Sequence, residues 1–364
     1  MIKFVDLNVQ YEAIKKDINN AIQEVLDSGR FVLGENVELF EKEFAAFCNA
    51  PYAVGANNGT SALHLALVAS GIGKGDEIIT APNTYIATCE AISYTCATPK
   101  FVDINQDTYA LDVNKLEKAI TEKTKAIMPV HLYGQSAGMK HIMEIAEKHN
   151  LIVIEDAAQS HGAEHYGKKI PFSDIGCFSF YPVKNLGAYG EGGMVVAKYK
   201  ELAEKIRIYR DHGQEKKNVH KYIGYNYRLE EMQAAILRVK LRHLPKWTEM
   251  RRKNAKLYNE LFEGSDVITP TEKDYNRHVY HLYIVRVKNR QKLIEHLSSK
   301  GIQTGIHYPV PVHLTEAYAG LGYKKGSFLV AEQCADEILS LPMYPELSEE
   351  DIMIVVKEIK EFLK

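Results

Sequence analysis

The sequence has little that would direct the protein to a membrane or out of the cell. None of its apolar runs approaches the roughly 18 residues that a membrane-crossing helix needs. The first residues, Met1 to Leu7, lack the apolar core and the cleavage site of a signal peptide. The five cysteines are widely spaced, odd in number and without a Cys-x-x-Cys pair, which argues against a disulfide framework and a zinc site. We therefore expect a cytoplasmic protein whose thiols are buried and reduced.

The charge balance also excludes some partners. The net charge is −2 over 364 residues, and no basic stripe is present, so nothing predicts binding to nucleic acid or to an anionic membrane. Apolar residues make up 46% of the chain and charged residues 25%, as in ordinary soluble proteins. This length allows one large domain or two medium ones.

Several catalytic motifs are missing as well. There is no Gly-x-Ser-x-Gly elbow, no phosphate loop ending in Gly-Lys-Ser/Thr, and no Gly-x-Gly-x-x-Gly after the first strand. No pair of histidines has metal-ligand spacing with a carboxylate nearby. Hydrolase, ATPase and nicotinamide chemistry therefore lack support, and we expect no metal site.

The periodicity of the first two thirds of the chain predicts an α/β fold. Short apolar strands alternate with helices of about 10–15 residues, a pattern typical of a mostly parallel sheet with helices on both faces. The strands are expected at 76–80, 100–103, 126–132, 151–155, 177–180 and 193–197. One helix is expected at 8–27, and a second runs from the break at 28–34 through residue 47. A third opens at the turn that begins at residue 57, and two more are expected near 113–120 and 138–149.

A smaller α+β domain is expected to follow. Residues 229–261 predict a long connecting helix or a helix pair, since their pattern is helical and charged on one face. The remaining segments predict strands at 278–287 and 302–308 and helices at 289–300 and 348–363. We therefore expect an N-terminal segment and large domain over 1–240 and a small C-terminal domain over 241–364.

Two residues indicate the chemistry. Lys184 follows aromatic residues and precedes a run of glycines, which let a backbone approach a ligand closely. Such a lysine, partly desolvated, can act as a nucleophile and then as a base. Asp156 ends the largely apolar run from Leu151, where ligands of open α/β sheets bind, although it could equally cap the next helix. Together they predict pyridoxal phosphate (PLP): the lysine would form a Schiff base, and the aspartate would pair with the protonated pyridine nitrogen.

Other residues could complete a PLP site. Asn58-Gly-Thr-Ser61 opens a helix whose free amides suit a phosphate, although capping explains the same residues. Ser179 could supply a hydroxyl to that phosphate, and Gln159 could contact the phenolic oxygen of the cofactor. Tyr85 could stack on the cofactor ring or be a core aromatic residue. The last two candidates, which could line the site or be satisfied buried histidines, are His131 and His161.

Eight ordered motifs give the chain a family resemblance. It resembles the DegT/StrS-type nucleotide-sugar aminotransferases, PLP enzymes of the aspartate-aminotransferase fold (fold type I), over essentially its whole length. The motifs are Asp27-Ser-Gly-Arg with Gly34, Asn58-Gly-Thr-Ser-Ala-Leu, Pro82-Asn-Thr-Tyr-Ile-Ala-Thr, Pro129-Val-His-Leu-Tyr-Gly-Gln, Glu155-Asp-Ala-Ala-Gln-Ser-His-Gly, Phe178-Ser-Phe-Tyr-Pro-Val-Lys-Asn-Leu-Gly-Ala, Gly224-Tyr-Asn-Tyr-Arg-Leu-Glu-Glu-Met-Gln-Ala-Ala and His307-Tyr-Pro-Val-Pro-Val-His.

The resemblance implies roles for individual residues. Lys184 would form the internal aldimine, and Asp156 would bind the pyridine nitrogen. The residues implied to hold the rest of the cofactor are Gln159 on the ring oxygen, Tyr85 on the ring face, and Gly59, Thr60 and Ser179 on the phosphate. Asn226 would contact the phosphate of the neighbouring subunit's cofactor, because the family forms homodimers with shared active sites.

The resemblance also implies a substrate. Some family members are dehydratases with a histidine at the position of Lys184, so the lysine favours transamination. Two of the motifs look most like enzymes that aminate C-3 of a dTDP-3-keto-6-deoxyhexose, with L-glutamate as donor, 2-oxoglutarate as product and pyridoxamine phosphate as the intermediate cofactor form. The product would be a dTDP-3-amino-3,6-dideoxyhexose, with a lean toward the gluco over the galacto epimer.

Alternatives stay open for substrate and role. Candidate substrate-side residues are Tyr181, His307, Tyr308 and His313, although the last three could equally form a proline-rich turn between the domains. The alternative activity is amination at C-4 of a UDP-, GDP- or dTDP-linked 4-keto-6-deoxy sugar. A non-catalytic regulator that keeps the PLP fold is a remote alternative, and it would need no lysine at position 184.

Overall fold

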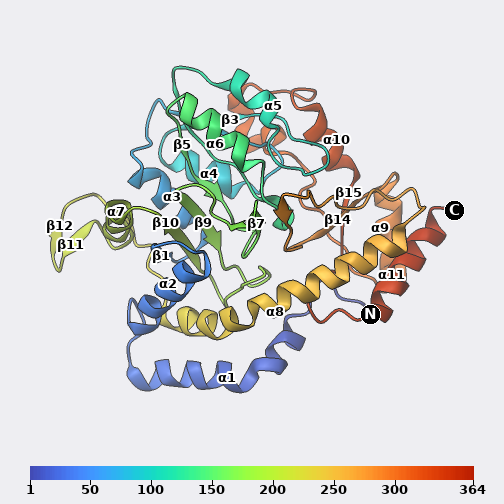
Figure 1. Cartoon of the computed structure of the whole chain (residues 1–364), viewed down its shortest axis with the longest axis horizontal. Coiled ribbons are helices and arrows are strands. Elements are labelled where there is room, and N and C mark those ends of the chain that lie inside the picture. Colours follow the sequence, from blue (N-terminus) through green and yellow to red (C-terminus); the bar gives the residue numbers. More distant parts are fainter.

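The centre of the molecule is a mostly parallel sheet (Figure 1). The computed structural model describes residues 1–364 and contains two four-stranded sheets, ordered β1-β10-β9-β6 and β3-β2-β4-β5. The two sheets are continuous, because each ends in one of two strands, β5 (Ile152–Val153) and β6 (Glu155–Asp156), that only Ile154 separates. A parallel bridge between Val130 and Asp156 also joins them.

The direction of the strands brings several loops to one edge of this sheet. β10 (Gly193–Ala197) is antiparallel to both of its neighbours, β1 (Tyr52–Ala56) and β9 (Ile175–Ser179), and the other pairings are parallel. The remaining strands are β2 (Glu77–Thr80), β3 (Thr98–Phe101) and β4 (Thr124–Ile127). The residues that follow β1, β2, β4, β6 and β9 therefore meet at the same carboxyl edge.

The expected parallel sheet is confirmed, but β1 was not predicted. Its sequence, Tyr-Ala-Val-Gly-Ala, contains the small residues that are depleted in strands, so its periodicity is weak. Successive residues of the sheet face opposite cores: Cys177 and Val195 contact one, and Phe178 and Met194 the other.

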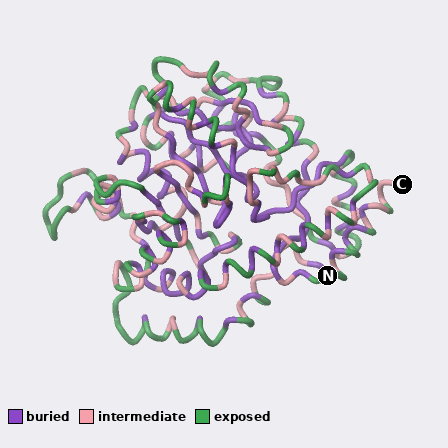
Figure 2. The backbone as a smooth tube through the Cα atoms, in the orientation of Figure 1, coloured by how far each residue is buried: buried purple, intermediate pink, exposed green.

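Helices cover both faces of the sheet. One face packs against α3 (Gly59–Ala69), α4 (Ala87–Tyr94) and α7 (Lys200–Arg210). The other packs against α2 (Glu35–Phe47), α6 (Met139–Lys148) and α8 (Glu231–Phe262). Figure 2 shows the result, with buried residues concentrated in the sheet and exposed ones on the outer helices.

The long helix α8 connects this core to the C-terminal part of the chain (Figure 1). Its earlier residues pack on α1 (Leu7–Ser28) and its later ones on α11 (Glu349–Phe362). The C-terminal part also contains β14 (Tyr283–Arg286) paired with β15 (Ile338–Leu341), and the helices α9 (Arg290–Ser299) and α10 (Leu329–Glu337). Since α8 runs unbroken through residue 240, the division at that residue stays a prediction.

In the C-terminal part, one predicted strand is absent and another is shorter than predicted. Residues 302–308 form only single bridges, from Ile302 to Ile2 and from Gly305 to Ser340. Within 278–287 only β14 is a strand, because the positive φ of Tyr280 is incompatible with an extended run.

Smaller elements complete the chain. The hairpin β11 (Gln214–Lys216) and β12 (Val219–His220) projects from the body of the molecule (Figure 1). The other short elements are α5 (Val113–Leu116), β7 (Glu164–His165), β8 (Lys168–Lys169), β13 (Asn276–Arg277) and four 3-10 turns at 117–119, 132–134, 312–314 and 316–321. None of the helices combines the length and the apolar character that crossing a bilayer requires.

A buried carboxylate fixes the start of α2 against α8. Gly34, the N-cap of α2, offers no side-chain cap, and Glu231 takes that role from α8. Its Oε1 accepts from the amides of Gly34 (2.7 Å) and Val37 (2.9 Å), and its Oε2 accepts from the amide of Asn36 (2.9 Å). Glu231 thus satisfies amides that the first turn leaves without partners and interacts favourably with the helix dipole.

Replacing Glu231 by alanine is expected to destabilise the protein by about 2–4 kcal/mol, because buried amides then lose a charged acceptor. Urea unfolding curves measure the change. The control is Glu230→Ala, an exposed neighbour whose change should stay within about 0.5 kcal/mol. Equal midpoints for the two variants would contradict the capping role.

Candidate active site

Asp156 lies at the carboxyl edge of the sheet, at the end of β6. Its side chain is buried, with 5% of the residue exposed. Oδ2 accepts a hydrogen bond from the Thr88 hydroxyl (2.7 Å), and Oδ1 accepts one from the Ala158 amide (3.1 Å). Burial raises the pKa of this carboxyl above its ordinary value, and the two hydrogen bonds oppose that shift. The site therefore favours a cation next to Asp156.

The loop after β2 supports that carboxylate. The Thr88 hydroxyl also lies 2.7 Å from the hydroxyl of Thr84, so a chain of two hydroxyl groups ends on Asp156. We did not identify Thr88 from the sequence. The available signal was its position in the Pro82-Asn-Thr-Tyr-Ile-Ala-Thr motif, which places it just after a strand that ends at the same edge.

Lys184 follows β9, and its amine lies close enough to Asp156 for their charges to interact. Burial lowers the pKa of Lys184 to about 8, and the negative charge of Asp156 acts in the opposite direction. The Lys184 amine forms neither a salt bridge nor a hydrogen bond, so Asp156 acts on its pKa through its charge alone. About a tenth of the amine is therefore unprotonated at pH 7, far more than for an ordinary lysine, and this form is the nucleophile.

Three histidines lie near the Lys184 amine. They are His161, His281 and His307, and the pKa of each is lowered first by burial and then by the positive charge of Lys184. These rings are therefore neutral near pH 7, and they leave Asp156 as the charge that faces the lysine. His281 was not among the residues predicted from the sequence, because its segment carries no local motif.

Gln159 and Tyr308 meet at the same edge. Gln159 Oε1 accepts from the Tyr133 amide (2.6 Å), which directs Nε2 toward the Tyr308 hydroxyl (3.3 Å). The Tyr85 ring lies 5.4 Å from that of Tyr308. Tyr85 is 56% exposed, so it is free to contact a ligand and is not a core aromatic residue. Tyr308 and the neighbouring His307, from the C-terminal part of the chain, thus contact residues that follow strands of the large sheet.

The start of α3 forms a narrow cradle beside Ser179. The Asn58 side chain caps α3 by accepting from the Ser61 amide (2.7 Å). A Cβ added to Gly59 would lie 2.6 Å from Cβ of Ser179, so only glycine allows this approach. The Thr60 amide belongs to the same first turn, whose orphan amides and dipole favour an anion. The cradle has the right chemistry for a phosphate.

The two histidines left open by the sequence have different surroundings. His131 is a satisfied buried histidine, since Nε2 lies 2.6 Å from Glu155 and Nδ1 accepts from the Ala137 amide (3.1 Å). His161 is fully buried among phenylalanines, and neither of its ring nitrogens has a hydrogen-bond partner. His161 lies near the Lys184 amine, whereas both ring nitrogens of His131 are taken up by Glu155 and the Ala137 amide.

Not every predicted residue joins this group. His313 is buried, with Nε2 3.0 Å from Glu332 and its ring 4.8 Å from that of Phe328, so the structure places it in the core rather than on the substrate side. Asn226 is exposed, and its backbone forms an antiparallel bridge to Asp211 just outside the hairpin of residues 214–220. Tyr181 is 49% exposed beside the cradle, where its amide donates to the Ser179 hydroxyl (3.3 Å).

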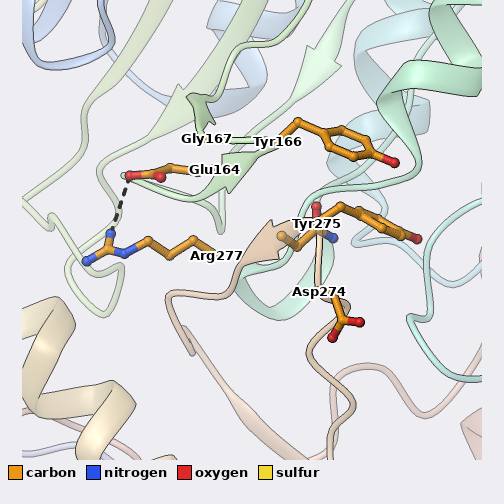
Figure 3. Close-up of a pocket in the computed structure, with 7 residues that line it drawn as sticks. Glu164, Tyr166, Gly167, Asp274, Tyr275 and Arg277 are labelled. Carbon is orange, nitrogen blue, oxygen red and sulfur yellow. Dashed lines mark ion pairs between the residues drawn. The ribbon is translucent and has the colours of Figure 1, made fainter.

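A separate pocket lies on the outer surface (Figure 3). It is open, has a volume of about 520 Å³ and is lined by the β7–β8 hairpin and the segment before and within β13. Tyr166 and Tyr275 stack on each other there, and Arg277 pairs with Glu164. None of the residues that surround Lys184 lines it, so it is distinct from the site described above.

The residues at the sheet edge fit PLP. An anionic group buried without a paired cation suits the pyridine nitrogen, the amine of Lys184 suits the aldehyde, and the cradle at α3 suits the phosphate. These three features belong to loops that follow β6, β9 and β1, which run in the same direction.

Comparison with known proteins identifies a family of aminotransferases. Residues 12–360 match the model of the DegT/DnrJ/EryC1/StrS aminotransferase family. The chain is 48% identical to a "Pleiotropic regulatory protein" of Geobacillus stearothermophilus, over 100% of this chain and 99% of the relative. It is 46% identical to a "dTDP-3-amino-3,4,6-trideoxy-alpha-D-glucose transaminase" of Streptomyces venezuelae, over 99% and 96%.

A solved structure is similarly close. The crystal structure of S. venezuelae DesV in complex with a ketimine intermediate superposes with a TM-score of 0.98 at 45% identity, and the match covers 100% of this chain and 98% of that one. The chain therefore belongs to the DegT/DnrJ/EryC1/StrS aminotransferase family and is a PLP-dependent sugar aminotransferase.

Proposed function

We propose that the protein transfers the amino group of L-glutamate to C-3 of a dTDP-3-keto-6-deoxyhexose, giving a dTDP-3-amino-3,6-dideoxyhexose. The observation that carries the proposal is the position of a partly unprotonated Lys184 near the buried carboxylate of Asp156 at the carboxyl edge of the sheet. A regulator without catalysis would not need that arrangement.

Lys184 is proposed as the residue that both binds the cofactor and moves the proton. Bound PLP supplies an electrophilic aldehyde and an electron-accepting ring. Lys184 Nζ, with a pKa of about 8, can take up a proton and return it near neutral pH. Asp156 remains ionised when a cation lies beside it, and the Thr88 hydroxyl holds its orientation. The proton carrier and the fixed charge are thus different residues.

The other residues are proposed to position the cofactor. Gly59, Thr60 and Ser179 would bind the phosphate, Gln159 the ring oxygen, and Tyr85 the ring face, since its own ring is exposed at this edge. Asn226 would serve the neighbouring subunit of a homodimer. Its exposure supports that assignment.

The substrate proposal rests on one relative and on the residues that surround the edge. The S. venezuelae relative is named as a "dTDP-3-amino-3,4,6-trideoxy-alpha-D-glucose transaminase", which supports amination at C-3 of a dTDP-linked sugar. Tyr181 is exposed there, and His307 and Tyr308 close the other side, so these three are proposed to contact the sugar. The gluco epimer is proposed from the sequence motifs alone, because a 4-deoxy sugar has no C-4 hydroxyl that could distinguish the gluco from the galacto epimer.

A reverse half-reaction tests the activity. The PLP form is mixed separately with dTDP-linked 3-amino and 4-amino 6-deoxyhexoses of both C-4 configurations, and the visible absorbance of bound PLP is followed. We expect loss of absorbance with a 3-amino sugar, fastest for the gluco epimer. Lys184→Ala should show no turnover, because both the cofactor linkage and the proton carrier are lost. A response to 4-amino sugars alone would move the reaction to C-4.

The pH dependence of PLP capture tests the state of Lys184. Because its pKa is lowered to about 8, the unprotonated fraction should rise about fivefold from pH 7 to 8 and level off above about 9. Capture of PLP by the cofactor-free protein, measured by stopped-flow absorbance, should follow this curve.

Asp156→Asn supplies the control for the direction of this shift. The charge of Asp156 raises the pKa of Lys184, so its removal should move the midpoint of capture to lower pH. A capture rate that keeps rising about tenfold per unit through pH 10, as for an ordinary lysine, would contradict the account.

A further inference from the structure

A second lysine, Lys240 of α8, is buried behind the loop that carries Lys184. Only 1% of its surface is exposed. Nζ donates to the Gly187 carbonyl (2.5 Å) and lies 4.8 Å from the centre of the Tyr189 ring. Burial lowers the pKa of Lys240 to about 7, and Glu346 opposes that shift. The ammonium group of Lys240 contacts a carbonyl and the face of a ring and forms no salt bridge with a carboxylate, which is rare for a buried lysine.

The contacted carbonyl belongs to a tight turn that contains Lys184. The Lys184 amide donates to the Tyr181 carbonyl, and the Ala188 amide donates to the Phe180 carbonyl, both at 2.8 Å. A Cβ added to Gly187 would lie 2.2 Å from the Pro182 carbonyl oxygen. The backbone at Gly187 is therefore pressed against Pro182, and Lys184 lies between these two contact points.

A second residue of α8 holds the far end of the same loop. Gln233, two helical turns before Lys240 and on the same face, accepts from the Tyr189 amide through Oε1 (3.0 Å). On the opposite side, the Asn185 amide group donates to the Val279 carbonyl (3.0 Å). The loop is thus held at Gly187 and Tyr189 from α8 and at Asn185 from the segment before β14.

We propose that Lys240 is a positioning residue for the reaction: through the Gly187 carbonyl it fixes the loop that aims the Lys184 amine. This inference rests on the proposed role of Lys184 and adds a residue that contacts neither cofactor nor substrate. A polar group this deeply buried costs free energy unless its hydrogen bond is made, and the bond it makes is to this loop.

The test compares Lys240→Met with Tyr258→Phe. Methionine keeps the stem of Lys240 and removes its donor. Tyr258 is also buried on α8 and donates to a backbone carbonyl, that of Pro342 (3.1 Å), but it lies in the C-terminal core. Both changes orphan one buried carbonyl, so the loss of thermal stability should be of similar size. The loop should respond to the first change only.

Hydrogen exchange of residues 181–190, measured by mass spectrometry on the full-length chain with and without PLP, gives a readout independent of activity. We expect exchange about tenfold faster in Lys240→Met and unchanged in Tyr258→Phe. Lys240→Gln, which restores a shorter N–H donor, should recover part of the protection and serves if the methionine variant does not fold. In the transamination assay, Lys240→Met should lower kcat about tenfold and change KM less than about twofold.

Unchanged loop exchange in the Lys240 variants, or a fall in kcat matched by Tyr258→Phe, would overturn the proposal. The exchange experiment also separates the two hypotheses. Faster exchange in the variants, with no turnover of any amino sugar by the unmodified chain, would leave the positioning role intact and reject the proposed function.

Discussion

The site depends on placing a carboxylate and an amine together in a buried, weakly solvated position. Burial works against both charges: it raises the pKa of Asp156 and lowers that of Lys184. The two residues are not tied to each other by an ion pair, so the amine stays available and the carboxylate can accept a different cation. This arrangement is costly for an empty site and suits a cofactor that brings a protonated ring nitrogen and an aldehyde.

The rest of the fold keeps that arrangement in place. Glu155, which precedes Asp156, is fully buried; burial opposes its ionisation, yet hydrogen bonds from His131 and Ser173 hold its pKa below the ordinary value. The end of β6 is therefore fixed on both sides, by Glu155 to the interior and by Thr88 at the edge. On the lysine side, α8 supports the loop through Gln233 and Lys240. Rigid elements thus hold both halves of the site.

Sequence periodicity predicted most strands of the sheet but missed β1 and the helices α4 and α7. The pair of Lys184 and Asp156 was predicted from the residues that follow two of those strands. Periodicity could not supply contacts made across the chain. Glu231 caps α2 and Thr88 binds Asp156, and both partners are distant in sequence. The sequence left His313 open between the substrate side and a turn between the domains, because a proline-rich segment gives no sign of which side chain turns into the core. Residues 302–308 have the composition of a strand but only isolated partners.

The central claim is that Lys184 holds the cofactor, and borohydride reduction of the PLP-loaded protein tests it most directly. Reduction fixes PLP to whichever amine carries it, and peptide mass mapping then locates the label. Our account predicts one label per chain, on the peptide containing Lys184, although Lys240 is also buried with a lowered pKa. A label on Lys240, or one spread over surface lysines, would contradict it.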